Sequence, residues 1–204
     1  TISITAGIRS AVKKNSFDDQ FWQVFSLICM SVPTFFIGLC LVFVFALRLG
    51  WLPSNGMPVD GSGLGEWVRF LVLPVITLTI TSLASTVRYV RNAMLDALSQ
   101  DYIRTARSKG LSEKVVVYSH AFRNALIPIV TVVIAQIGTL FGGSMITESV
   151  FVWDGMGSTL LTALNRRDFY LVIAMNMFYA VVYLISNFIA DLTYALVDPR
   201  IKLD

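Results

Sequence analysis

The feature that most restricts the fold of this chain is a set of four long stretches without a charged residue. These strongly apolar stretches are residues 20–47, 70–87, 124–147 and 169–190. A transmembrane helix needs roughly 20 apolar residues, since each residue adds about 1.5 Å along the helix axis. The shortest stretch reaches that length if Arg69 and Arg88 extend their side chains toward the membrane surfaces. We therefore predict an all-α integral membrane protein with spans at about residues 21–49, 68–95, 125–147 and 169–195.

Composition agrees with a membrane protein of several spans. Only 14% of the residues are charged, whereas soluble domains contain roughly 25%. Pro33, Pro74 and Pro128 lie inside or at the edge of predicted spans. A helical bundle tolerates such prolines as kinks. A hinge that moves during transport is the alternative role for them.

The distribution of basic residues predicts the orientation of the chain. Most of the 16 Lys and Arg residues precede the first span, lie between the second and third spans, or follow the last one, as Arg200 and Lys202 do. The positive-inside rule then places both ends of this sequence and the 97–124 segment in the cytoplasm. Because topology explains the net charge of +3, no nucleic-acid partner is expected.

The sequence contains no motif for ATP hydrolysis or for metal binding. There is no Gly-x-x-x-x-Gly-Lys-Ser/Thr phosphate loop, so the chain is not expected to hydrolyse ATP. No group of His, Cys and acidic residues has metal-site spacing. The single histidine, His120, is interpreted as a loop or packing residue. We therefore expect neither an enzyme nor a cofactor in this chain.

Four polar residues interrupt the later predicted spans. They are Gln136, Asn176, Asn187 and Asp191. A polar group at membrane depth costs free energy unless it is paired, so each is expected to face another helix or a wetted pathway. Helix packing is one interpretation. Gln136 and Asn176 are the candidates for a translocation pathway.

The 97–124 segment contains more structure than a tether needs. Ser99 or Asp101 is expected to cap a short helix that Gly110 ends, and Ser112 to cap a second helix that returns to the membrane. On the first helix Tyr102, Thr105, Ala106 and Lys109 share one stripe, from their spacing.

This helix, corner and return helix would present a basic knob to the cytoplasm. Ala106 and Gly110 would allow a partner's backbone to come close, and Arg104, Arg107 and Lys109 would add charge complementarity. A solvated basic loop that only obeys the positive-inside rule is the alternative.

The segment "DYIRTARSKGLSEKVVVYSHAFRNALIP" resembles the signature loop of bacterial ABC-importer permeases. That loop opens with Glu-Ala-Ala and continues to a glycine; here Arg104, Thr105 and Ala106 stand at the opening and Gly110 at the glycine. "HAFRNALIP" is similar to the peptide/nickel branch, the oligopeptide and dipeptide permeases of B type. Further similar stretches are "SVPTFFIGL", "WLPSNG", "GGSMITESVFVWDGMG", "RRDFYLV" and "DLTYALVDPRIK". Pro128 follows Gly110 at a longer distance than in most of the superfamily, as this branch alone leads one to expect.

The resemblance implies a MetI-like helical bundle of six spans, four of which lie in this sequence, so that residues 1–204 form the C-terminal part of the transmembrane domain. It implies a second, similar permease, two cytoplasmic ATPases that bind ATP and Mg, an extracytoplasmic solute-binding protein, and a bacterial or archaeal plasma (inner) membrane. A coupling helix at residues 101–111 would sit in a groove of one ATPase. The residues implied in coupling are Tyr102, Arg104, Thr105, Ala106, Arg107, Lys109, Gly110 and Leu111.

The function expected from the resemblance is that of a permease subunit of an ATP-driven peptide importer. Nickel or glutathione import by the same class stays open, because nothing in these residues fixes the substrate. A secondary transporter that works without ATPases is an alternative from another class. It would need ionisable residues at mid-bilayer, and the predicted spans hold almost none.

Overall fold

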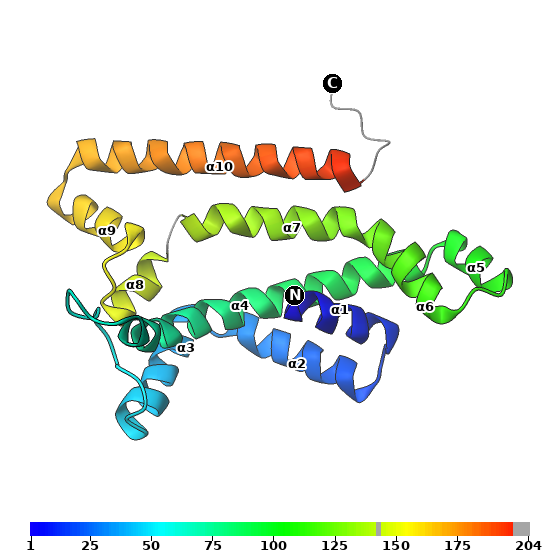
Figure 1. Ribbon diagram of the computed structural model, residues 1–204, viewed down its shortest axis with the longest axis horizontal. Coiled ribbons are helices and arrows are strands. Elements are labelled where there is room, and N and C mark those ends of the chain that lie inside the picture. Colours follow the sequence, from blue (N-terminus) through cyan, green and yellow to red (C-terminus); the bar gives the residue numbers. More distant parts are fainter. Residues whose placement is uncertain (142–143, 198–204) are drawn as a thin grey trace. The chain divides into compact units, whose positions relative to one another are not determined.

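The described residues of the chain form helices and connecting loops (Figure 1). The helices group into two units, each of which combines separate parts of the sequence. The structure is a computed structural model that describes residues 1–141 and 144–197, with side chains described for residues 1–136 and 144–193. Within these residues, unit 1 contains 1–30, 83–136 and 186–197, and unit 2 contains 31–82, 137–141 and 144–185. Arg200 and Lys202, used above to orient the chain, lie outside the described residues.

Unit 1 contains the N-terminal helices and the 97–124 segment. Its elements are α1 (Ile2–Val12), α2 (Phe17–Ser31), the second half of α4 (Leu64–Leu98), α5 (Asp101–Ser108), α6 (Glu113–Val115), the π-helix η2 (Val116–Phe122), most of α7 (Arg123–Phe141) and the end of α10 (Phe169–Val197). One buried apolar cluster joins α1, α4, α5, η2 and α7, with Val90, Met94 and Val116 at its centre, all 0% exposed. The 97–124 segment is therefore packed onto the helices that precede and follow it.

The α1–α2 hairpin is held to α4 by close packing and by a buried ion pair. A Cβ atom on Gly7 would lie 2.7 Å from Val90 Cβ, so only glycine lets α1 come this near to α4. Asp19 is fully buried and accepts hydrogen bonds from Arg91 Nε and Nη2, at 2.6 and 2.9 Å. Ser10 Oγ donates to the same carboxylate at 2.6 Å. A buried carboxylate needs such full pairing, because unpaired burial of a charge is costly.

Unit 2 contains the remaining helices. These are α3 (Thr34–Leu41), the π-helix η1 (Val42–Arg48), the first half of α4, α8 (Met145–Phe151), α9 (Met156–Arg166) and most of α10. Phe151 joins three of its parts. The Phe151 ring lies 3.3 Å from the position of a Cβ on Gly38 of α3, and the Phe151 carbonyl accepts a hydrogen bond from Gly56 N at 2.8 Å.

Within the described residues, three helices are long and apolar enough to cross a membrane: Leu64–Leu98, Glu113–Gln136 and Phe169–Thr193. The helices Phe17–Ser31 and Thr34–Arg48 pass the same test only as a bent pair, which gives up to four spans. Pro74 and Pro128 lie inside helices that continue on both sides of them.

Two predicted spans differ from the helices observed. The span at 21–49 is interrupted, since α2 ends at Ser31 and α3 begins after Pro33, which lacks the N–H that would continue the helix. The span at 125–147 was predicted as one helix, but α7 ends at Phe141 and a new helix begins after Ser144. The Ser144 side chain accepts a hydrogen bond from Thr147 N and so caps α8.

Candidate functional site

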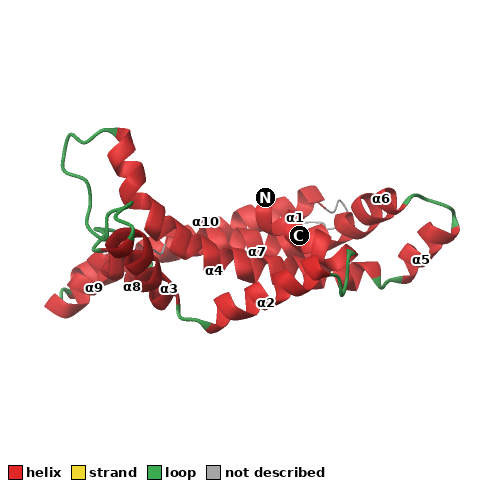
Figure 2. Cartoon of the chain, turned by 90° about the horizontal axis from the view of Figure 1, so that it is seen from below, coloured by secondary structure: helices red, strands yellow, loops and turns green. Residues whose placement is uncertain are grey.

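The 97–124 segment forms a helix, a glycine corner and a returning helix (Figures 1 and 2). α5 ends at Ser108, and Gly110 has a φ of +76°, in the left-handed region that glycine adopts readily. α6 then leads without interruption into η2 and α7. The predicted order of helix, corner and helix is confirmed.

The predicted cap of α5 is wrong, because its N-cap residue is Gln100 and neither Ser99 nor Asp101. Ser112 is the N-cap residue of α6, as predicted. Neither Gln100 nor Ser112 makes a capping side-chain hydrogen bond. Ser99 Oγ instead donates to the Asp96 carbonyl at 2.8 Å, near the end of α4. Ser99 thus hydrogen-bonds to the last turn of α4, the helix that precedes it.

The inner face of α5 packs on unit 1 itself. Ile103 is 0% and Ala106 is 5% exposed, and both belong to the buried cluster with Val116, Val117 and Ala121 of η2. Ala106 was expected at the tip of the knob, open to a partner. Its side chain is instead buried against the chain's own residues, where its small size lets α5 approach η2.

The outer face of α5 and the corner are open and mostly polar. The exposed residues are Asp101, Tyr102, Arg104, Thr105, Arg107, Ser108, Lys109, Gly110 and Leu111. Arg104 lies 3.4 Å from Asp101, whereas Lys109 makes no ion pair within the described part of the chain. Nothing lies within 4 Å of the position of a Cβ on Gly110. Of the eight residues implied in coupling, all except Ala106 are therefore accessible.

An ion pair bridges the corner. Arg107 Nε and Nη2 donate to the two carboxylate oxygens of Glu113, at 2.7 and 3.2 Å. This hydrogen-bonded pairing raises the pKa of the Arg107 guanidinium above its usual range. Both side chains are substantially exposed, so the pair shapes the corner more than it stabilises the fold.

In the returning helix, α6 is followed by a π-helical stretch that was not predicted from the sequence. Over Val116–Phe122 the backbone is wider than in an α-helix. His120 lies in this stretch, half-buried, and its carbonyl accepts a hydrogen bond from Asn124 Nδ2 at 2.6 Å. This bond involves the backbone of His120, so the loop or packing role of its side chain stays a prediction. π-Helical turns are frequent at functional sites.

A pocket of about 450 Å³ lies where α4, α5 and α7 meet. Its lining residues are Tyr89, Asn92, Ala93, Asp96, Ala97, Gln100, Tyr102, Asn124, Ala125 and Pro128. Apart from Tyr102, these residues were not among the predicted site residues. The signal was present, since Tyr89, Asn92 and Asp96 recur at helical spacing on one face of α4.

The two pathway candidates lie in different units. Gln136 Nε2 on α7 donates to Thr86 Oγ1 on α4 at 2.8 Å, as a residue that joins two helices does. Asn176 is exposed, and its Nδ2 donates to the Val172 carbonyl of its own helix at 2.8 Å. Asn187 and Asp191 are exposed as well.

Long apolar helices and a basic connection with an open polar face define a helical membrane protein. Within the described residues, no three His, Cys, Asp or Glu side chains could hold a metal ion together. The chain belongs to the family of binding-protein-dependent transport system inner membrane components, whose family model matches residues 3–203.

Individual relatives in this family carry transport names. The chain is 40% identical to the di/tripeptide transport system permease of Pseudomonas aeruginosa, over 99% of this chain and 66% of that protein. It is 38% identical to the oligopeptide transport system permease of Bacillus subtilis, over 98% and 64%. It is 37% identical to the glutathione transport system permease of Escherichia coli, over 98% and 62%. The chain thus spans about two thirds of the length of these relatives.

Proposed function

We propose that this chain is the transmembrane part of a permease subunit in an ATP-driven, binding-protein-dependent importer of peptides. The match of residues 3–203 to a family of transport-system membrane components carries this proposal. Two of the relatives described above are named for oligopeptide and for di- or tripeptide transport, which favours peptides as the substrate class. Glutathione is the second candidate substrate, because a relative at 37% identity is named for it.

The open face of α5 and the Gly110 corner are proposed to dock on a partner ATPase. Lys109 has no ion pair within the described part of the chain, and Arg104 is only weakly engaged, so both charges are available to acidic groups of a partner. Tyr102 and Leu111 are 40% and 39% exposed and offer apolar contact area beside these charges. Thr105 and Gly110 complete the surface, and Arg107 contributes through its pairing with Glu113.

The packing of α5 suggests how a movement of the ATPase would reach the membrane. Ile103 and Ala106 are buried against η2, and η2 continues directly into α7. Close-packed elements move together, since a packed core transmits displacement. A displacement of α5 would therefore move the start of α7. Gln136 lies further along the same helix. In this proposal Ala106 transmits movement inside the chain and does not touch the partner.

The remaining parts of the proposal follow from the family. A second permease subunit, two ATPases that bind ATP and Mg, and an extracytoplasmic solute-binding protein would complete the importer in the inner membrane. The 97–124 segment and both ends of this sequence would face the cytoplasm, as the distribution of Lys and Arg predicts. Gln136 and Asn176 stay proposed as pathway residues.

Charge reversal on the open face tests the docking proposal. The chain is co-expressed with the ATPases and second permease of its own system, carrying Arg104→Glu and Lys109→Glu together. We expect at least about a tenfold loss of co-purified ATPase, because both charges are reversed at the contact. Membrane insertion should be normal, since both side chains are exposed.

The matched control is Lys13→Glu, an exposed basic residue in the turn between α1 and α2. It should retain the ATPases. Equal ATPase recovery from the double variant and from this control would rule out docking through α5. Uptake of dipeptides against glutathione by proteoliposomes with the cognate binding protein then separates the two candidate substrates.

A further inference from the structure

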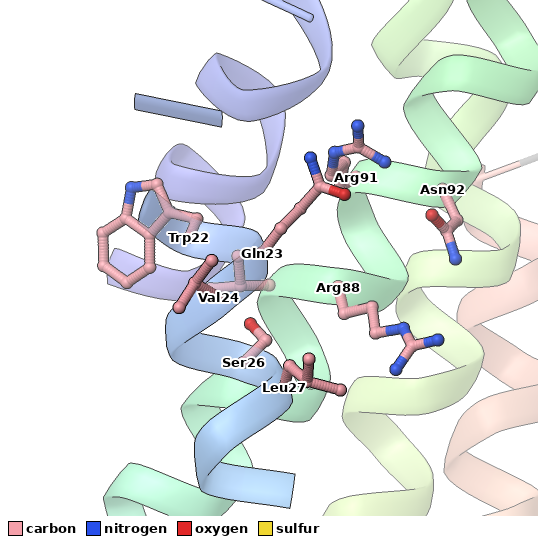
Figure 3. Close-up of a pocket in the computed structure, with 9 residues that line it drawn as sticks. Trp22, Gln23, Val24, Ser26, Leu27, Arg88, Arg91 and Asn92 are labelled. Atoms are coloured by element: carbon pink, nitrogen blue, oxygen red, sulfur yellow. The ribbon is translucent and has the colours of Figure 1, made fainter. Parts of the chain in front are cut away.

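A second pocket of unit 1, of about 320 Å³, lies between α2 and α4 (Figure 3). Its lining residues are Trp22, Gln23, Val24, Ser26 and Leu27 of α2 and Val87, Arg88, Arg91 and Asn92 of α4. Guanidinium, amide and hydroxyl groups make up its polar part, and none of these nine residues is acidic. The pocket therefore offers hydrogen-bond donors and positive charge.

One buried polar atom in this pocket lacks a partner. Ser26 is 1% exposed, and its Oγ makes no hydrogen bond within the described residues. By contrast, the equally buried Ser10 donates to Asp19. Leaving a buried hydroxyl unsatisfied costs free energy, so such an atom in a pocket points to a group that the pocket receives.

The two arginines of the pocket differ in how far their charge is compensated. Arg91 is held by both carboxylate oxygens of Asp19. Arg88 is exposed and makes no ion pair or hydrogen bond within the described residues. In Figure 3, Arg88 and Asn92 project from neighbouring turns of α4, while Gln23 reaches from α2 toward Arg91. A free guanidinium among neutral donors suits an anion, and phosphate is a group that arginine binds well.

The pocket lies where apolar helix gives way to polar helix. Arg88 directly follows the uncharged stretch 70–87 of α4. On α2, Phe21, Trp22 and Phe25 form an aromatic cluster with ring centroids 5.3 to 6.1 Å apart. Tryptophan, here Trp22, is enriched at the membrane–water boundary. The next residues of α2 present an exposed apolar surface, with Val24 and Leu27 more than half exposed.

We propose that this pocket binds the phosphate headgroup of an anionic phospholipid at the membrane–water boundary. Arg88 supplies the charge, the Ser26 hydroxyl and the Asn92 amide donate to phosphate oxygens, and the acyl chains lie along Val24 and Leu27. A choline headgroup is disfavoured, because its cation would meet the arginines. This site is separate from the α5 surface and does not depend on the proposed transport function.

Lipid retention by the purified chain tests the site. The chain is incubated in detergent with equal amounts of phosphatidylglycerol and phosphatidylcholine, and bound lipid is measured by native mass spectrometry. We expect the chain to prefer phosphatidylglycerol about tenfold, and Arg88→Gln to remove most of this preference, since a charge-assisted hydrogen bond is lost. Ser26→Ala should lower it less, by about threefold, because a neutral donor is weaker.

Arg123→Gln is the matched control, because Arg123 is an exposed arginine of the same unit that does not line the pocket. It should retain the preference. If Arg88→Gln and Ser26→Ala keep phosphatidylglycerol as well as Arg123→Gln does, the proposed site is wrong.

Thermal unfolding separates a lost ligand from a damaged fold. Without lipid, Ser26→Ala should unfold at or above the temperature of the parent chain, since it removes an unsatisfied buried hydroxyl. Phosphatidylglycerol should raise the unfolding temperature of the parent chain more than that of the variant, because a ligand stabilises the state that it binds. Inorganic phosphate is added in a parallel series. An increase that depends on Arg88 with inorganic phosphate, but not with phosphatidylglycerol, would overturn the assignment to a lipid.

Discussion

Two connections between helices of this chain contain glycine, and glycine is favoured there for different physical reasons. In the corner between α5 and α6, Gly110 has a φ of +76° and open space around the position of a Cβ. Between α8 and α9, Gly155 is the N-cap residue of α9 and Gly157 lies in the first turn of that helix. Neither has such a φ, but a Cβ on either would lie 2.5 to 2.7 Å from other atoms. Gly110 is favoured by its backbone conformation, whereas Gly157 is required by lack of space beside the backbone of Met145.

Each connection also has a glutamate, and the two glutamates differ in how far they are exposed to solvent. Glu113 faces solvent and pairs with Arg107 across the open corner. Glu148 lies under the other turn, where its Oε2 accepts a hydrogen bond from Ser158 N at 2.8 Å, in the first turn of α9. One connection thus keeps its surface open to solvent, whereas the other is filled by the Glu148 side chain and holds α8 and α9 together.

The largest effect is expected for Gly157→Ala. Its Cβ would lie 2.6 Å from Met145 N and 2.7 Å from Met145 Cα, and backbone atoms cannot turn aside as a flexible side chain can. Such overpacking should lower the free energy of unfolding by about 3 kcal/mol, measured by denaturant titration in detergent. Gly65→Ala is the control, because nothing lies within 4 Å of its Cβ position. Equal losses for both variants would show that space at Gly157 is not limiting.

A smaller effect is expected for Gly110→Ala. The new side chain meets no neighbour, but the left-handed conformation costs a residue with a Cβ about 1 kcal/mol. Gly110→Asn should be milder, since asparagine tolerates positive φ better. The same unfolding titration checks this order. A loss as large for asparagine as for alanine would argue against a conformational cause.

The smallest effect is expected for Glu113→Ala, and the contrast with Glu148→Ala sharpens the comparison. The Glu113 ion pair is exposed to water and salt, so its loss should leave the unfolding midpoint almost unchanged. Glu148→Ala removes the acceptor of Ser158 N in the partly buried first turn of α9 and should cost about 1 kcal/mol. If the Glu113 variant lost the more stability of the two, the corner would not be the open connection described here.

Much of the architecture was readable from the sequence because it follows from local rules. The uncharged stretches marked the long helices, and the glycine between two helical patterns of the 97–124 segment marked the corner at Gly110. The inner face of α5 could also have been found, because Ile103 and Ala106 are apolar positions three residues apart in a polar helix. The predicted stripe of Tyr102, Thr105, Ala106 and Lys109 left out Ile103, because Ala106 was interpreted by its small size and not by its apolar character.

Other features depend on contacts that no local pattern contains. Pro33 and Pro74 both lie in apolar stretches, yet a helix begins after the first and runs through the second. The partners of Glu148 and the unsatisfied hydroxyl of Ser26 are set by packing between helices. The π-helical backbone of η2 likewise has no signature in "VVYSHAF".

The buried pair of Asp19 and Arg91 has a consequence for the order in which the protein is assembled. The two residues are 72 positions apart, so the ribosome makes Asp19 long before Arg91 exists. Until α4 is synthesised, the beginning of α2 carries a carboxylate without its guanidinium, and burial of that charge is unfavourable. The α1–α2 hairpin can therefore take its final place only after α4 has entered the membrane. In this order of assembly, α1 and α2 pack onto an α4 that is already in place.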